Sequence, residues 1–196
     1  MHQEELDAVL ERARACRLCE AQLPLGPRPV LRAHVESRVL IVGQAPGTAV
    51  HRTQMPWNDP SGRRLREWLD VGEPEFYDPR KFAILPMGFC YPGKGKGGDL
   101  PPRPECAPTW HPPLRALLPN LRLTLLLSRY AVDFYLGDRQ RETLSATVAA
   151  WRELPPDLLA LPHPSPRNNR WLRERPWFEA EVVPELRRRV RAALAT

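Results

Sequence analysis

The sequence predicts an α/β fold, a three-layer α/β/α sandwich around a short, mainly parallel sheet of four strands. Three observations lead to this prediction. Short apolar runs that suit buried strands recur at 38–47, 82–89, 121–128 and 157–162. Segments with apolar residues at helical spacing alternate with these runs, as in a parallel sheet covered by helices. The first and last runs lead into unusual loops, GQAPG and HPSPRN, and such sheets bind ligands beyond the carboxyl ends of their strands.

The first half of the chain alternates between helix and strand. Apolar residues at helical spacing predict an amphipathic helix over 3–15. The run RVLIV then predicts a buried parallel strand that feeds the loop GQAPG. Ser61 is expected to cap a helix that runs through Val71. The next apolar run, FAILPMGF, predicts a second strand, and Pro86 within it indicates an edge position or an early end.

The second half begins with a segment that suits neither helix nor strand for long. Residues 91–108, rich in glycine and proline, predict a long loop that is either functional or disordered. After the third strand, helices are expected over 129–136 and 142–151, and the fourth strand follows. The tail from Trp177 carries an apolar stripe and predicts a helix that breaks or kinks near Pro184.

The length of the chain and its net charge limit the classes of protein to which it can belong. The chain has 196 residues, and we expect one domain over 1–196. No run approaches the roughly 18 to 20 apolar residues of a membrane-spanning helix, and the N-terminus lacks the features of a signal peptide. We therefore expect a cytoplasmic monomer without a membrane partner, associated at most with a bacterial nucleoid. The net charge of +6 is compatible with a nucleic-acid partner and equally with a solvated basic surface.

The four cysteines suggest a metal centre. Cys16 and Cys19 form a C-x2-C pair, whereas fifteen residues lie between Cys90 and Cys106. Zinc ribbons more often show two C-x2-C pairs. A [4Fe–4S] cluster accepts thiolates from scattered segments of a chain. The spacing alone leaves three interpretations open: an iron–sulfur cluster, a zinc site and four unrelated cysteines.

The loop HPSPRN combines a stiff backbone with side chains that suit catalysis and binding. Two prolines fix the backbone on either side of Ser165. His163 precedes them and Arg167 follows. His163 is either a hydrogen-bond donor in a site or a histidine bonded to a loop carbonyl, and its place after the fourth strand favours the site.

Together these motifs resemble the iron–sulfur uracil-DNA glycosylases, families 4 and 5 of their superfamily. The four cysteines match the cluster ligands in order and approximate spacing. GQAPG matches the first active-site motif and HPS the last. Trp57, in MPWNDPSG, occupies the position of the aromatic residue that stacks on the flipped base. The resemblance covers most of the chain, from Cys16 to Arg170.

The resemblance implies a monofunctional DNA N-glycosylase that flips a deaminated base, uracil before others, out of DNA and removes it by hydrolysis. It implies a structural [4Fe–4S] cofactor and damaged DNA as the partner. His163 would donate a hydrogen bond to the leaving base. The expected base contacts are Gly43, Gln44, Ala45, Trp57, Asn58 and His51. The expected DNA contacts are Ser165, Arg167, Asn168, Lys94 and Lys96. For the two lysines, a solvated loop is the alternative.

Departures from the family pattern bear on the chemistry. Ala45 stands where the best-known branch has a catalytic aspartate, and Gln44 replaces a glutamate of family 4. An amide cannot act as a base, so the catalytic role expected of Gln44 is to bond the base or to orient water. Asp59 is therefore a candidate to orient water or stabilise the sugar cation, or it is an ordinary turn residue. Pro86 stands where family 4 has an asparagine that reads uracil, which leaves hypoxanthine, xanthine and a catalytically silent DNA-binding homologue as alternatives.

For two further residues, Arg167 and His51, more than one role is open. Arg167 resembles the arginine in the HPSPR loop of the single-strand-selective branch, so that it is either a wedge pushed into the duplex or a phosphate contact. His51 lies in a region from which one branch of the superfamily attacks the sugar covalently. A pocket-lining or surface role is the expectation favoured for His51, because the basic insertion of that branch is missing.

Overall fold

The computed structural model describes residues 2–195. Its centre is a four-stranded sheet in the order β2-β1-β5-β6, with every neighbouring pair parallel. The strands are β1 (Val39–Val42), β2 (Phe82–Ile84), β5 (Leu123–Leu126) and β6 (Leu158–Ala160). All of their residues are buried, as expected for a parallel sheet covered on both faces. The predicted fold class is confirmed, although each strand is shorter than its apolar run.

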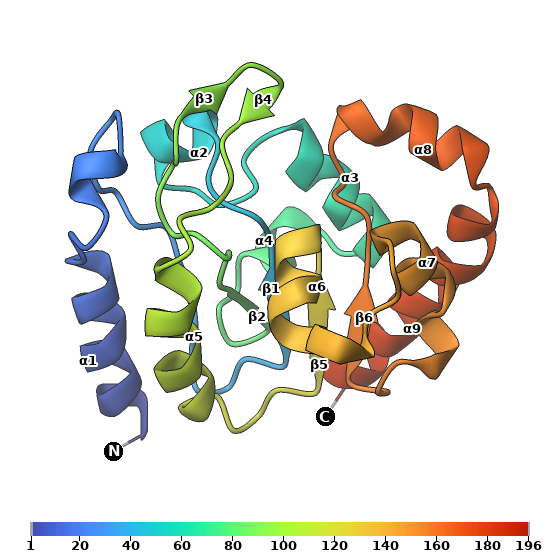
Figure 1. Cartoon of the computed structure of the whole chain (residues 1–196). Helices are drawn as coiled ribbons and strands as arrows, with labels where there is room; N and C mark the ends of the chain where they lie inside the picture. The colour runs from blue at the N-terminus through green and yellow to red at the C-terminus, as the bar shows by residue number, and fades with distance from the viewer. Residues whose placement is uncertain (1, 196) are drawn as a thin grey trace.

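Helices cover both faces of this sheet (Figure 1). One face carries α5 (Cys106–Ala116) and α6 (Arg129–Leu136). The opposite face carries α3 (Pro60–Leu69) and α9 (Val183–Leu194), which pack against each other. The N-terminal helix α1 (His2–Arg14) packs on the outer side of α5. The result is the expected three-layer arrangement.

Several short elements complete the described part of the chain. The remaining helices are α2 (Thr48–Thr53), α4 (Glu73–Phe76), α7 (Leu144–Ala149) and α8 (Asn169–Glu174). A small antiparallel hairpin joins β3 (Lys94–Gly95) to β4 (Gly98–Asp99). Single 3-10 turns lie at Glu20–Gln22, Gly137–Arg139, Trp151–Glu153 and Pro166–Asn168, and a π turn at Phe178–Val182. No helix within residues 2–195 is long and apolar enough to cross a membrane.

Two proline predictions are confirmed. Strand β2 lies at an edge of the sheet and ends at Ile84, before Pro86. Pro184 lies in the first turn of α9, directly after the π turn, so that the C-terminal helical segment is broken where the sequence predicted. Both outcomes agree with the missing N–H of proline, which removes a backbone hydrogen bond from a strand or a helix. The rule is not absolute in this protein, because Pro112 and Pro113 lie inside α5.

The predicted cap of the helix after Trp57 is wrong. Asp59, not Ser61, caps α3, because its carboxylate accepts a hydrogen bond from the Gly62 N–H at 2.8 Å. Pro60 then occupies the first helical turn, where its fixed φ and missing N–H are tolerated. The helix predicted over 142–151 is also shorter: α7 ends at Ala149.

Candidate active site

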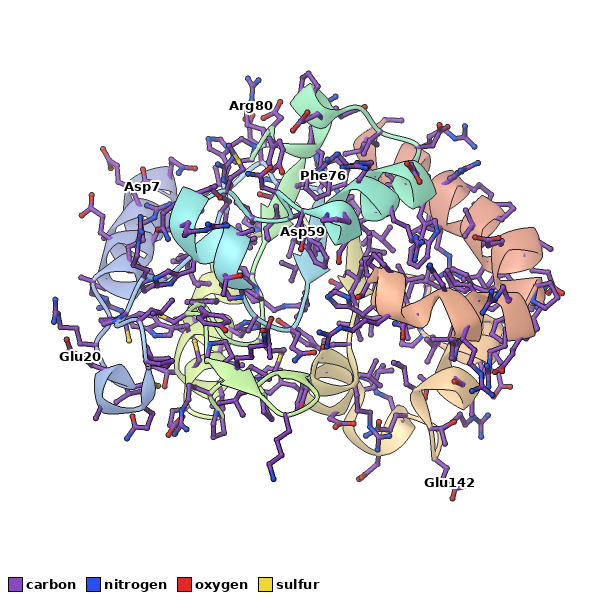
Figure 2. All side chains as sticks on the ribbon, turned by 90° about the horizontal axis from the view of Figure 1, so that it is seen from above. Asp7, Glu20, Asp59, Phe76, Arg80 and Glu142 are labelled. Carbon is purple, nitrogen blue, oxygen red and sulfur yellow. The ribbon has the colours of Figure 1, made fainter. Side chains whose placement is uncertain are left out.

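A cavity of about 420 Å³ lies beyond the carboxyl ends of the strands. The loop after β1, the segment that leads into α3, the β3–β4 hairpin and the loop after β6 all contribute to its wall. Its lining includes Gly43, Gln44, Ala45, Pro46, Gly47, Trp57, Asp59, Pro86, Asp99, His163, Ser165, Arg167 and Asn168. Figure 2 views the molecule from this side and places Asp59 near its centre, beside the start of α3. The GQAPG and HPSPRN loops therefore meet at one site.

The loop after β1 forms a fixed wall of this cavity. The Gly43 carbonyl accepts a hydrogen bond from the Met87 N–H at 3.0 Å, and the Gln44 carbonyl accepts one from the Gly88 N–H at 2.9 Å. These bonds hold Pro86 against the cavity. A Cβ atom at Gly43 would lie 2.9 Å from the Trp57 ring, so glycine is needed for the indole to pack here.

Trp57 is held in an uncommon backbone conformation. Its φ of 59° lies in the left-handed region, which disfavours bulky residues. Neighbouring groups secure it: the Arg66 guanidinium donates to the Trp57 carbonyl at 3.3 Å, and the Tyr77 hydroxyl donates to the Pro56 carbonyl at 2.9 Å. A Cβ atom at Gly62 would overlap the Trp57 carbonyl oxygen. Several contacts thus determine the position of the indole.

The hydrogen bonds of His163 define its tautomer. The Ser165 N–H donates to His163 Nδ1 at 3.2 Å, so Nδ1 is unprotonated and the neutral ring carries its proton on Nε2. The Asn168 amide donates to the His163 carbonyl at 2.7 Å and fixes the loop. Burial lowers the pKa of His163, while the Asp59 carboxylate acts in the opposite direction. The ring lies beside Trp57, with centroids 5.5 Å apart.

Two carboxylates line the cavity, and only one of them was predicted. Asp59 is engaged as the cap of α3. Asp99 pairs with Lys94 through its backbone in the β3–β4 hairpin, whereas its carboxylate forms no hydrogen bond or ion pair within residues 2–195. The Oδ2 atom of Asp99 lies 3.5 Å from where a Cβ atom at Gly47 would be. Asp99 lies in the segment 91–108, which the sequence predicts to be a long loop. No sequence feature indicated that this loop folds over the GQAPG segment.

Arg167 connects the two sides of the cavity. Its guanidinium donates to the Gly97 carbonyl at 3.0 Å, and a Cβ atom at Gly98 would overlap it. Ser165 Oγ accepts a hydrogen bond from the Arg167 N–H at 3.2 Å. The three polar side chains of this loop that were predicted to contact DNA, those of Ser165, Arg167 and Asn168, are therefore hydrogen-bonded to the protein itself. Lys94 and Lys96 are exposed on the hairpin, outside the cavity lining.

The structure does not bring two predicted base contacts to the cavity. Asn58 is exposed, and it is absent from the lining. His51 is buried in α2, which directs its ring towards Tyr91 with a centroid distance of 6.1 Å, and its Nδ1 atom has no partner within residues 2–195. Burial and the nearby Arg28 lower the pKa of His51. Base contact by either side chain is thus not supported.

The four cysteines lie around a second, much smaller hollow. Cys16, Cys19, Cys90 and Cys106 all line a cavity of about 20 Å³ between the end of α1, the loop after β2 and the start of α5. Burial, with a smaller effect from the neighbouring cysteines, raises the pKa of Cys90 to about 11 and that of Cys106 to about 12. The Phe89 N–H donates to Cys106 Sγ at 3.3 Å.

Within residues 2–195, no three His, Cys, Asp or Glu side chains form a group that could hold a metal ion. A [4Fe–4S] cluster takes one thiolate at each of four irons and needs a wider site than a single ion. The set of four thiols around one hollow, with an N–H directed at a sulfur, fits such a cluster.

The fold and cavity define an α/β protein with a ligand site between a held aromatic ring and a neutral histidine donor. The family model of the uracil DNA glycosylase superfamily matches residues 32–187, and the chain belongs to this superfamily. Membership implies DNA glycosylase activity in general, with DNA as the partner. Cys16 and Cys19 lie outside the matched residues.

Proposed function

We propose that this protein is a monofunctional glycosylase that acts as a monomer on a deaminated base in DNA, with uracil as the first base to test. The observation that carries the proposal is the His163–Trp57 pair, which presents an N–H donor and an aromatic face in one cavity. Extruding a nucleotide from the stack costs a few kcal/mol, least where the base is damaged. The Trp57 face offsets part of that cost by stacking on the base.

Cleavage of the glycosidic bond moves its electron pair onto the base and leaves positive charge on the sugar. The Nε2–H of His163 donates to the base oxygen on which negative charge develops. A preorganised donor of this kind lowers the barrier by about 3 kcal/mol. The neutral ring is the form that the structure favours, because burial lowers the pKa of His163.

Water then completes the hydrolysis and loses a proton as it bonds to the sugar carbon. Gln44 and Ala45 offer no base for this step. Among the cavity-lining residues, the carboxylates are those of Asp59 and Asp99. We assign to them the stabilisation of the sugar cation and the acceptance of the proton from water. Asp99 is the better acceptor, since neither oxygen of its carboxylate is hydrogen-bonded within residues 2–195, whereas Asp59 caps α3.

Two residues of the cavity wall, Pro86 and Gln44, bear on which base the protein selects. Pro86 lines the cavity and offers no side-chain hydrogen bond, whereas the Gln44 amide offers both a donor and an acceptor. Gln44 is therefore the proposed reader of the base edge. Hypoxanthine and xanthine present amide edges of the same kind and remain alternative substrates.

The four cysteines are proposed to hold a structural [4Fe–4S] cluster. When bound, the cluster would supply a covalent tie between the N-terminal segment and the loop from Cys90 to Cys106, and no redox chemistry is required for base removal. That loop contains the β3–β4 hairpin and therefore Asp99. The cysteines would thus position one wall of the base cavity.

The test is anaerobic purification followed by incubation with oligonucleotides that carry uracil, hypoxanthine or xanthine, and alkaline cleavage of abasic sites. Excision of one base, lost in Trp57→Ala and His163→Ala, supports the proposal and names the substrate. A folded, DNA-binding protein that excises none of the three bases contradicts it and favours a non-catalytic binder. A brown, iron-containing preparation supports the cluster, and a colourless, zinc-loaded one overturns it.

A further inference from the structure

Another hollow, of about 420 Å³, adjoins the base cavity and is distinct from the one lined by the cysteines. Val30 belongs to the lining of both. Three arginines line this hollow: Arg14 at the end of α1, and Arg28 and Arg32 in the extended segment that follows. The Gln54 amide, just after α2, completes its polar lining. We call this feature the arginine groove.

The charges of the arginine groove are not compensated by the protein. Its lining contains no Asp or Glu. Within residues 2–195, the exposed side chains of Arg14 and Arg28 form no hydrogen bond or ion pair, unlike Arg189, which donates to Glu185 at 2.7 Å. Two free guanidinium groups directed to one hollow favour an anionic ligand.

The backbone of the groove is fixed before any ligand binds. Prolines lie on both sides of Arg28 and restrict its backbone. The Val30 N–H donates to the Phe89 carbonyl at 2.8 Å, and Arg32 exchanges hydrogen bonds with Ile84 of β2 at 2.9 and 2.7 Å. The segment is therefore anchored along the edge of the sheet, and binding there would need little reordering of the backbone.

Unlike those of Arg14 and Arg28, the guanidinium group of Arg32 is held by contacts within the protein. Arg32 lies over the Tyr77 ring at 5.3 Å and contacts the Met55 sulfur at 3.2 Å. Tyr77 also supports the segment that carries Trp57, through its bond to Pro56. The groove and the base cavity thus share a supporting residue as well as the Val30 wall.

We propose that the arginine groove binds a backbone phosphate of the DNA strand that continues past the extruded nucleotide. This inference rests on the proposed function and adds a subsite to it. A phosphodiester matches the planar donors of guanidinium groups, and phosphate contacts fix the register of a protein on DNA. A contact beside Val30 would hold the strand while its neighbouring nucleotide occupies the cavity.

The test measures affinity and its salt dependence by fluorescence anisotropy with labelled, undamaged oligonucleotides, in single- and double-stranded form. Arg14→Gln and Arg28→Gln remove the charge and keep a polar, unbranched side chain. Arg122→Gln is the matched control, because Arg122 is an exposed arginine at the opposite, N-terminal end of β5. For each phosphate that a variant no longer neutralises, the salt slope should fall by about 0.9 on duplex and about 0.7 on single strands. The affinity at low salt should fall several-fold in both groove variants and stay unchanged in the control.

Each possible result either supports or overturns the proposed phosphate subsite. Groove variants that bind both forms of DNA with the affinity and salt slope of Arg122→Gln overturn it, whether or not the wild type excises a base. Weaker binding by the groove variants supports the subsite even if the substrate base is still unidentified. A wild-type protein that binds neither form of DNA overturns the subsite and the proposed function together. Thermal melting of all three variants checks that each one is folded.

Discussion

The Ser165 N–H donates to Nδ1 of His163 at 3.2 Å, and this bond places the proton of the neutral imidazole on Nε2. A backbone N–H cannot accept a hydrogen bond, so the alternative neutral tautomer would forfeit this bond. The two prolines around Ser165 hold its backbone in place. The backbone of the HPSPR segment thus fixes the atom from which His163 donates a hydrogen bond.

The first prediction concerns His163. His163→Ala should lower the single-turnover rate of base excision by roughly 100- to 1000-fold, because a preorganised donor to the leaving base is removed. The measurement is the excision rate on the best substrate of the base panel, with DNA affinity as the control for folding and binding. A variant with the wild-type rate would remove His163 from the mechanism.

The pH dependence of the same rate tests the tautomer. Burial lowers the pKa of His163, so the neutral donor should persist below its ordinary value of about 6.5. Activity should therefore be constant near neutral pH and decline only as the pH falls through that lowered pKa. A rate that rises on acidification through this range would indicate that the imidazolium is the active form.

The second prediction concerns the space beneath Trp57. Gly62→Ala should destabilise the protein by about 1 to 3 kcal/mol and reduce excision, because the new methyl group would overlap the Trp57 carbonyl. Urea titration measures the free energy of unfolding. Gly72→Ala is the matched control, because a Cβ atom there meets only Pro74 at an ordinary contact distance of 3.7 Å. Equal stability of both variants would show that the Trp57 segment moves freely.

Local sequence signals predicted the four strands of the sheet, because each strand lies within a short apolar run. Pro86 correctly indicated an edge strand. The wrong cap shows the limit of such signals: both Asp59 and Ser61 are good cap residues, and the position of Pro60 after Asp59 was the deciding feature. The four-residue helix α4 lacks the length from which periodicity can be recognised.

The part of the site that sequence could not predict depends on contacts between distant segments. The hairpin folds over the cavity with Gly93 at a φ of 106° against Pro24, and with Arg167 bonded to Gly97. Neither contact has a local signature. For this reason Asp99 was missed, although GQAPG and HPSPRN were correctly placed at the carboxyl ends of strands.

The third prediction separates the two carboxylates of the cavity. Asp99→Asn should lower the excision rate by roughly 100-fold, the usual lower range for an acid–base group, with little change in stability because its carboxylate bonds nothing within residues 2–195. Asp138→Asn, at an exposed turn, is the matched control. An unchanged rate in Asp99→Asn would assign the acid–base role elsewhere.

Asp59→Asn completes this comparison. Asparagine caps helices about as well as aspartate, so the bond to Gly62 should survive and stability should be nearly constant. A fall in the excision rate would then report the missing negative charge near His163. If Asp59→Asn slows excision more than Asp99→Asn does, the roles assigned to the two residues are reversed.

The last prediction concerns His111, which is buried behind the cavity wall. Its Nε2 atom donates to the Pro86 carbonyl at 3.0 Å, and its Nδ1 atom accepts from the Tyr135 hydroxyl at 2.6 Å. Burial lowers the pKa of His111 to about 4. In the unfolded chain a histidine titrates near 6.5. The stability that the neutral ring contributes is thus fully present above about pH 6.5 and lost as the pH falls towards 4.

Acidification from pH 7 to pH 4 should therefore lower the free energy of unfolding by about 3 kcal/mol through His111 alone, with smaller contributions in the same direction from His51 and His163. His111→Gln keeps an amide donor for Pro86 but cannot titrate. It should be less stable than the wild type at pH 7 and lose clearly less stability on acidification. Urea titrations across this pH range measure both slopes. If His111→Gln kept the full acid dependence, the neutral ring behind Pro86 would not be what limits stability in acid.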